Sequence, residues 1–250
     1  MLALRGRAAL ARLRQPWAPW LLAFAGLFLY HALYFAALKA APPAEASLVN
    51  YLWPMLIVLF SAWLPGQGGG GRLRARHVAG AAMGLAGTAL VLRQGGGPGE
   101  WPAGAALKGY GAALGAAFTW AGYSVLNQRF AAVPSEVIGG VCGAVAAAGL
   151  ACHLALERSA TPDAGGWAAI VLLGVGPVGL AFFAWDYATK HGNLPVLGAL
   201  SYLAPLLSTA LLVAAGRAEA SLGLAVAAAL VIGGAAVATS PRARSAGRSR

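Results

Sequence analysis

The sequence contains few charged residues. Only 10% of its 250 residues are charged and 59% are hydrophobic, whereas soluble globular domains have about 25% charged and roughly 45–50% apolar residues. A water-soluble core would need short apolar runs with a polar face. The apolar residues here come instead in blocks of about 20, the length that crosses a hydrocarbon layer as a helix. The composition therefore argues against an ordinary soluble domain and predicts an all-α integral membrane protein.

Cysteines and acidic residues are also scarce. Cys142 and Cys152 fall within one predicted span, too far apart along a helix to bridge each other, so neither a disulfide framework nor a metal spacing is present. Asp186 lies four residues before Lys190, which favours an ion pair on one helix over a proton-coupling carboxylate. The sequence lacks His-Glu-x-x-His and Gly-x-Ser-x-Gly motifs, a P-loop and an intramembrane carboxylate pair. We therefore expect no enzyme, no cofactor and no metal.

The apolar blocks predict eight transmembrane helices. Short segments rich in Gly, Pro and charge separate them, and none of these segments is long enough to form a soluble domain. The predicted spans are 17–38, 45–64, 77–92, 105–127, 136–156, 166–188, 194–215 and 221–239.

The basic residues indicate an orientation. A net charge of +11 would indicate nucleic-acid binding in a soluble protein, since clustered Lys and Arg follow phosphates. Most of these residues lie instead in loops and tails between the apolar blocks. Thirteen of the eighteen Lys and Arg fall on the side of the membrane that holds both termini. The positive-inside rule therefore predicts that both termini are cytoplasmic, and the position of the basic residues in loops argues against a nucleic-acid partner.

An offset of 151 residues aligns two parts of the chain. It lays "NYLWPMLIVL" (50–59) on "SYLAPLLSTA" (201–210) and pairs Tyr51 with Tyr202. In span order, it relates the first helix to the sixth and the second to the seventh. Five spans is an odd number, so the two copies would cross the membrane in opposite directions. This arrangement is typical of transporters built from inverted repeats.

Prolines mark the corresponding midpoints of these spans. Pro54 and Pro205 are paired by the offset, and Pro177 lies in the sixth span close to two glycines. Proline lacks a backbone donor and clashes with the preceding turn, so we predict helix kinks at all three. The carbonyls of Asn50 and Ser201 would lose their helical partners and should face a cavity or another helix, because lipid cannot satisfy them.

Aromatic side chains with polar groups gather near mid-span. Tyr30 and Tyr34 share a helix face with His31 one step round, and Trp120 and Tyr123 share another face. Aromatic belts would place such residues at span ends. Each tyrosine could instead be a packed residue with one hydrogen bond, and His31 could bond a neighbouring helix rather than line a cavity. The predicted substrate-binding residues are Tyr30, His31, Tyr34, Asn50, Tyr51, Trp53, Trp120, Tyr123 and Tyr202.

Three stretches carry a resemblance to a known family: "LYHALYFAALKAAPPAEASLVNYLWPMLIVLFSAWL" (28–64), "TWAGYSVLNQRF" (119–130) and "GPVGLAFFAWDYATKHGNLPVLGALSYLAPLLSTALLV" (176–213). They resemble the drug/metabolite transporter superfamily, EamA type, and within it the aromatic amino acid exporter branch. The resemblance implies ten helices in two inverted five-helix repeats around a central cavity. It also implies that the following residues line the substrate path: Tyr30, His31, Tyr34, Tyr51 and Trp53.

The chain matches this pattern except at its start. We expect residues 17–92 to form a partial first repeat of three helices and residues 105–239 a second repeat of five, so that the two helices that would precede residue 17 are lacking. The sequence predicts an inner-membrane permease that exports small amphipathic metabolites, foremost aromatic amino acids, by alternating access. Its partners would be a small-molecule substrate and the lipid bilayer. The alternatives are a transporter of a drug-like or sugar-linked solute, or a truncated membrane subunit that transports nothing.

Overall fold

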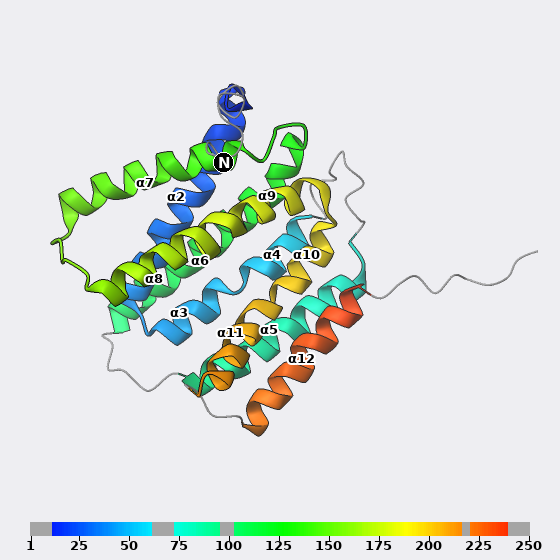
Figure 1. The fold of residues 1–250 in the computed structure, drawn as a ribbon. Helices are drawn as coiled ribbons and strands as arrows, with labels where there is room; N and C mark the ends of the chain where they lie inside the picture. Colours follow the sequence, from blue (N-terminus) through cyan, green and yellow to red (C-terminus); the bar gives the residue numbers. More distant parts are fainter. Residues whose placement is uncertain (1–11, 62–72, 96–102, 217–220, 240–250) are drawn as a thin grey trace, which may run out of the picture.

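The computed structural model describes residues 12–61, 73–95, 103–216 and 221–239, and the regular structure in these ranges is entirely helical (Figure 1). The helices are α2 (Trp17–Ala40), α3 (Pro43–Asn50), α4 (Trp53–Phe60), α5 (Ala75–Gly95), α6 (Ala103–Leu126), the 3₁₀-helix η1 (Asn127–Phe130), α7 (Val137–Leu156), α8 (Ala164–Val175), the π-helix η2 (Gly176–Leu180), α9 (Ala181–His191), α10 (Leu194–Ser201), α11 (Leu203–Ala214) and α12 (Leu222–Thr239).

Several of these helical stretches can cross a membrane by length and composition. Five of them reach the required length and hydropathy, and the stretch Glu45–Phe60 is apolar but shorter. The prediction of an all-helical membrane protein is therefore confirmed for the described residues. The predicted number of eight spans remains a prediction. The five stretches are Trp17–Ala40, Val137–Leu156, Ala164–His191, Leu194–Leu211 and Leu222–Thr239.

Two spans are broken at matching positions. α3 and α10 each have eight residues, and the bounds of α10 follow those of α3 by the same offset that the sequence repeat has. Each break lies just before a proline, Pro54 or Pro205, which cannot donate the backbone bond that would join the two halves. α3 and α4 together run in the opposite direction to α10 and α11 (Figure 1).

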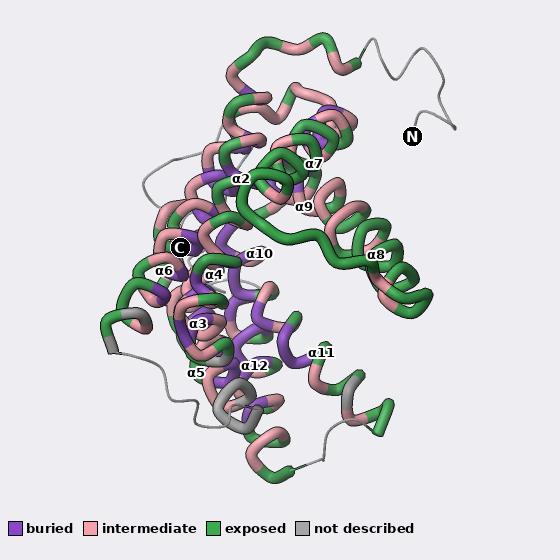
Figure 2. Tube along the Cα trace, turned by 90° about the vertical axis from the view of Figure 1, so that its left-hand side faces the viewer, coloured by how far each residue is buried: buried purple, intermediate pink, exposed green. Residues whose placement is uncertain are grey.

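The span that contains α8 and α9 is interrupted differently. The π-helix η2, with Pro177 as its second residue, lies between them. π-helical turns are rare, occur mostly inside longer α-helices and are frequent at functional sites. None of the residues of α8 is buried, and no purple appears along it in Figure 2, whereas Asp186, Thr189 and Lys190 near the end of α9 are buried. One half of this span is therefore anchored in the protein and the other is not.

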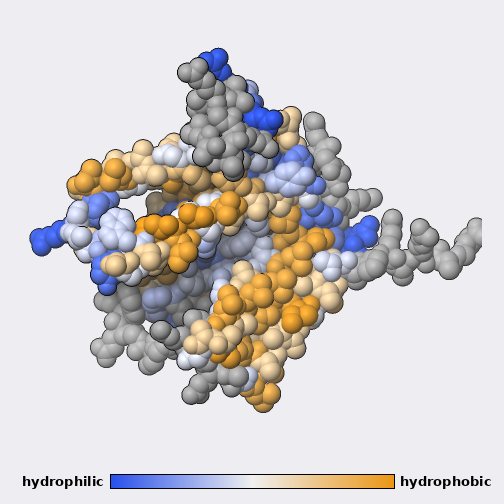
Figure 3. All heavy atoms as spheres, in the orientation of Figure 1, coloured by the Kyte–Doolittle hydropathy of each residue, from blue (hydrophilic) through white to orange (hydrophobic). Residues whose placement is uncertain are grey.

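The core lies where α2 packs on α6, α4 crosses α6 and α10, and α5 packs on α12. The last pair approaches closely because both helices carry glycine at the contact: a Cβ atom at Gly80 would lie 2.4 Å from the carbonyl oxygen of Gly234. Apolar side chains also cover much of the face seen in Figure 3. Leu154 and Leu211 are both 71% exposed, as expected where lipid is the solvent.

Candidate functional site

Trp120 on α6 is the centre of a group of aromatic rings. The side chain is 7% exposed, and its ring centroid lies 5.0 Å from that of Tyr30, 6.3 Å from that of Trp53 and 5.8 Å from that of Trp185. Four separate helices, α2, α4, α6 and α9, thus meet through these four rings. Two further rings contact Trp120, and together the six form the aromatic cluster: Tyr30, Trp53, Trp120, Tyr123, Phe182 and Trp185.

Ring packing and hydrogen bonds hold the side chains of the aromatic cluster in place. Trp53 meets Trp185 nearly perpendicularly, at 87° and 5.4 Å, and such a pair contributes about 0.5–1.5 kcal/mol beyond burial. The indole Nε1 of Trp185 donates to Ser124 Oγ at 3.0 Å, and Ser124 Oγ donates to the carbonyl oxygen of Trp120 at 2.7 Å. The only polar atom of the Trp185 side chain is therefore satisfied, and the ring is held against α6.

A second polar arrangement joins α2 to α3. Asn50 Nδ2 donates to the hydroxyl oxygen of Tyr30 at 3.1 Å, and the hydroxyl of Tyr34 lies 3.0 Å from Ser47 Oγ. Asn50 is 4% exposed, and its Oδ1 has no hydrogen-bond partner among the described residues. Because Tyr30 accepts from Asn50, its own hydroxyl proton remains available for another acceptor. The region thus offers one buried acceptor and one donor.

His31 is oriented by its own helix. Its Nδ1 lies 2.7 Å from the carbonyl oxygen of Leu27, and a carbonyl only accepts, so Nδ1 carries a proton. In the neutral ring Nε2 is then an acceptor. The imidazole also contacts Tyr30, with ring centroids 5.2 Å apart, and Phe182 at 5.8 Å. His31 therefore lies between the aromatic cluster and a neighbouring cavity, which it also lines.

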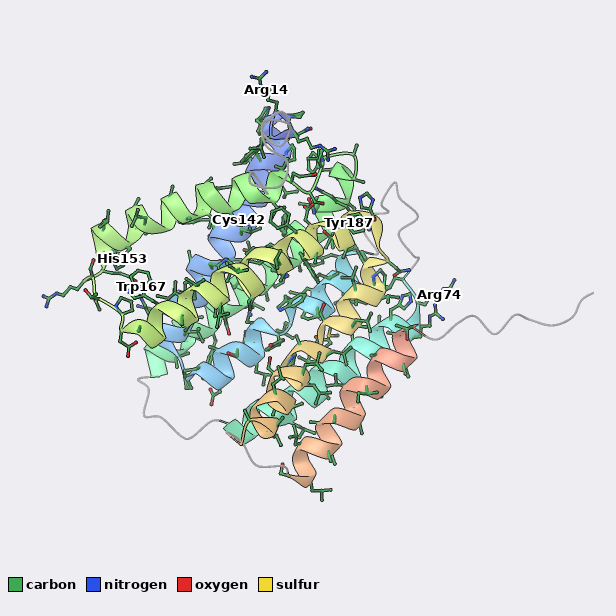
Figure 4. The ribbon with its side chains drawn as sticks, in the orientation of Figure 1. Arg14, Arg74, Cys142, His153, Trp167 and Tyr187 are labelled. Atoms are coloured by element: carbon green, nitrogen blue, oxygen red, sulfur yellow. The ribbon has the colours of Figure 1, made fainter. Side chains whose placement is uncertain are left out.

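This cavity has a volume of about 620 Å³ and lies between α2, α7 and the η2–α9 region. Lys39 and Glu157 lie at its rim and form an ion pair of 2.8 Å, with His153 Nδ1 2.9 Å from the other carboxylate oxygen of Glu157. The hydrogen bonds from Lys39 and His153 lower the pKa of Glu157 to about 2. Figure 4 shows His153 at the far end of α7, opposite the start of α8. The apolar lining includes Leu27, Phe28, Val145, Leu156, Val178 and Phe182.

Eight of the nine predicted binding residues lie in or beside the aromatic cluster and the cavity. Tyr202 lies elsewhere: it is fully buried in a separate core with Val58 and Leu206, and its hydroxyl donates to the carbonyl oxygen of Tyr51 at 3.0 Å. The bond joins the two broken helices beside their prolines. The side chain of Tyr51 interacts electrostatically with Tyr34 and Tyr30. The eight are Tyr30, His31, Tyr34, Asn50, Tyr51, Trp53, Trp120 and Tyr123.

Sequence reasoning missed Phe182, Trp185 and Ser124. The repeat itself held a signal for two of them: the offset of 151 that pairs Tyr51 with Tyr202 also pairs His31 with Phe182 and Tyr34 with Trp185. Ser124 carries no such signal, because a serine on a helix is indistinguishable in sequence from a residue that bonds only its own backbone. Within the described residues, no group of three or more His, Cys, Asp or Glu side chains could hold a metal ion.

Comparisons with known proteins show which family the chain resembles. The model of the EamA-like transporter family matches residues 1–93 and 107–240. The aromatic amino acid exporter YddG of Ancylobacter novellus is 55% identical over 92% of this chain and 78% of the relative. YddG of Salmonella typhimurium is 29% identical over 67% of this chain, which spans 57% of that relative. A crystal structure of a protein 55% identical to this chain superimposes with a TM-score of 0.84, over 92% of this chain and 78% of the other.

Proposed function

Because the chain belongs to the EamA-like transporter family, we propose that it exports amino acids with aromatic side chains across the inner membrane by alternating access. The relative that is 55% identical is named an aromatic amino acid exporter. The observation that carries the proposal is the cavity of about 620 Å³ with an aromatic wall. Its volume lies within the range of about 300–1,000 Å³ that is usual for small-molecule sites.

The aromatic cluster suits the side chain of such a substrate. Phe182 and His31 line the cavity, and both contact rings of the cluster behind them. An incoming phenyl or indole ring can therefore pack edge-to-face or offset against rings that are already fixed. Because lipid is as apolar as the ring, area burial alone would favour the site little over the bilayer, so the geometry of ring contacts must supply selectivity.

The polar groups suit the two charged ends of an amino acid. Asn50 Oδ1 and His31 Nε2 are acceptors for an ammonium group, and the free hydroxyl proton of Tyr30 is a donor for a carboxylate. A buried acceptor without a partner costs about 1–3 kcal/mol, which a bound ammonium group would recover. Asn50 donates to Tyr30 and does not itself line the cavity, so binding of the ammonium group at Asn50 requires a shift of the Tyr30 side chain.

Alternating access is supported by the contacts between repeat partners. His31 contacts Phe182 and Tyr51 bonds Tyr202, and each pair is separated by the offset of the repeat. Equivalent residues that touch each other lie close to an axis relating the two copies. The two broken helices beside this axis run in opposite directions (Figure 1). We therefore place the substrate between inverted halves that rock about it, with both termini in the cytoplasm.

Efflux from proteoliposomes tests this function. Vesicles containing the purified chain are loaded with labelled tryptophan, phenylalanine, leucine, a cationic drug or a sugar nucleotide. We expect faster efflux of the two aromatic amino acids than from protein-free vesicles, with leucine slower. Transport of only the drug or the sugar nucleotide would refute the substrate class. Efflux equal to that of protein-free vesicles for every solute would instead support a non-transporting subunit.

A further inference from the structure

A buried polar network joins η1, which directly follows α6, to the end of α9. Asn127 Nδ2 donates to Asp186 Oδ1 at 2.9 Å and lies 3.0 Å from Thr189 Oγ1. Lys190 Nζ donates to Asp186 Oδ2 at 2.7 Å and to the carbonyl oxygen of Val133 at 3.0 Å. The Asp186 and Lys190 side chains are only 1% and 3% exposed. The predicted ion pair is thus present, and it has additional partners on another element.

Stability alone does not explain this network. Replacing a buried ion pair by apolar residues of similar size is often neutral or stabilising, because the pair must first lose its water. Charged groups are better suited than apolar ones to a contact that must open, because they cost less free energy to separate in water. Water can satisfy a separated carboxylate and ammonium group, whereas separated apolar surfaces would be exposed to water at a free-energy cost. A buried network of charges therefore suits a closure that is repeatedly broken.

The network lies on one side of the aromatic cluster, at the η1 end of the bundle. Along α6 it follows Trp120 by seven residues, which is roughly 10 Å at the rise of an α-helix. Three apolar side chains from three helices, Ile57, Val125 and Leu194, form a buried group against Trp53 and Trp185, each no more than 2% exposed. Val125 lies between Trp120 and Asn127 along the chain, so packed apolar side chains and then hydrogen bonds follow the rings on this side.

The opposite side of the cluster differs. The repeat offset that pairs Tyr51 with Tyr202 also pairs Lys39 with Lys190. The Lys39 side chain is 71% exposed and its partner Glu157 47% exposed, at the rim of the cavity, while Lys190 is buried. Equivalent lysines thus occupy an open end and a closed end. Alternating access requires one side closed while the other is open, so this asymmetry describes one state of a cycle.

We infer that the network of Asn127, Asp186, Thr189 and Lys190 closes the η1 side of the substrate path and must break in each transport cycle. The inference rests on the proposed alternating-access function. Asp186 follows Trp185 directly in α9, so the network also positions a ring of the aromatic cluster. Breaking it releases α9 from η1 and loosens the wall of the site at the same time. Asp186 and Lys190 are therefore positioning residues that act through Trp185.

A disulfide across the network tests the closure. Asn127→Cys and Thr189→Cys are introduced together, in a background with Cys142→Ala and Cys152→Ala, and cross-linking is verified by mass spectrometry. We expect oxidation to reduce amino acid efflux at least tenfold relative to the reduced double variant, with recovery on reduction. The single variants should not respond to the oxidant. A verified cross-link that leaves efflux unchanged would overturn the inference, because the contact would then never need to open.

A labelling experiment tests the same closure without transport. In proteoliposomes, Thr189→Cys is exposed to a thiol reagent with and without the additional change Asp186→Asn. We expect at least fivefold faster labelling when Asp186 is replaced. Thr88→Cys is the matched control, because Thr88 is also fully buried but lies on α5, and its labelling should not change. Equal labelling of Thr189→Cys in both backgrounds would refute the closure. Failure of efflux with every amino acid would instead refute the proposed function, and the labelling result would still stand.

Discussion

Replacing Trp53 by alanine separates a binding role from a packing role. Trp53 is half-buried, and its ring lies at 82° and 6.3 Å to Trp120 and at 87° and 5.4 Å to Trp185. Each edge-to-face contact is worth about 0.5–1.5 kcal/mol. The substitution therefore removes two ring contacts, which together contribute about 1–3 kcal/mol to the folded protein. This loss lowers the amount of protein in the membrane whether or not Trp53 touches substrate.

A binding role predicts an additional effect on affinity. If a substrate ring packs on Trp53, its loss weakens binding by about 0.5–1.5 kcal/mol, which is about a twofold to thirteenfold change. The assay is the KM of tryptophan efflux in proteoliposomes with equal amounts of protein. We expect the KM of Trp53→Ala to rise within this range and that of Trp53→Phe to rise less, because one ring remains.

Leu59→Ala provides the matched control. Leu59 lies on the same helix, is 36% exposed and has no place in the aromatic cluster. Its replacement should leave the KM unchanged. If Trp53→Ala reduces efflux only in proportion to its lower abundance, with the KM of the parent chain, then Trp53 contributes packing alone and the reasoning is refuted.

Three further predictions concern the site and the orientation. His31→Gln should retain most of the efflux per molecule and His31→Leu should not, because a hydrogen-bonding group is needed at that depth; full activity of the leucine variant would remove His31 from the site. Gly26→Ala should destabilise the protein by about 1–3 kcal/mol, because its Cβ would lie 2.6 Å from the Tyr123 ring. Gly115→Ala, whose Cβ would have ordinary contacts from 3.4 Å outward, should leave thermal unfolding in detergent nearly unchanged, and equal shifts in the two variants would contradict this. A fluorescent protein fused to the C-terminus should fluoresce in the cytoplasm, and an active phosphatase fused there would reverse the orientation.

Local sequence patterns predicted much of the fold and four of the six residues of the aromatic cluster. Tyr30 and Trp120 could be found because each shares a helix face with a second aromatic residue near mid-span. The same spacing rule says nothing about which faces meet. That α2 and α6 bring these two rings to 5.0 Å depends on long-range packing, which no local pattern records.

The sequence repeat also relates residues other than the prolines. It predicted the equivalence of Tyr51 and Tyr202, but not that they bond each other, since a repeat relates two positions without giving the axis between them. Tyr202 was expected in the binding site because it is a tyrosine near mid-span. Its hydroxyl bonds the carbonyl oxygen of Tyr51 near the break in the α3–α4 span, so this polar group has a partner within the protein, which no local pattern predicted.

Photolabelling with a substrate analogue tests the central claim most directly. Membranes containing the chain are irradiated with the free amino acid azidophenylalanine, and the modified peptides are identified by mass spectrometry. We predict modification on α2, α4, α6 or α9 around the aromatic cluster, and its suppression by excess tryptophan but not by excess arginine. Modification confined to other helices, or modification on these four that excess tryptophan does not suppress, would contradict binding of an aromatic amino acid at this site.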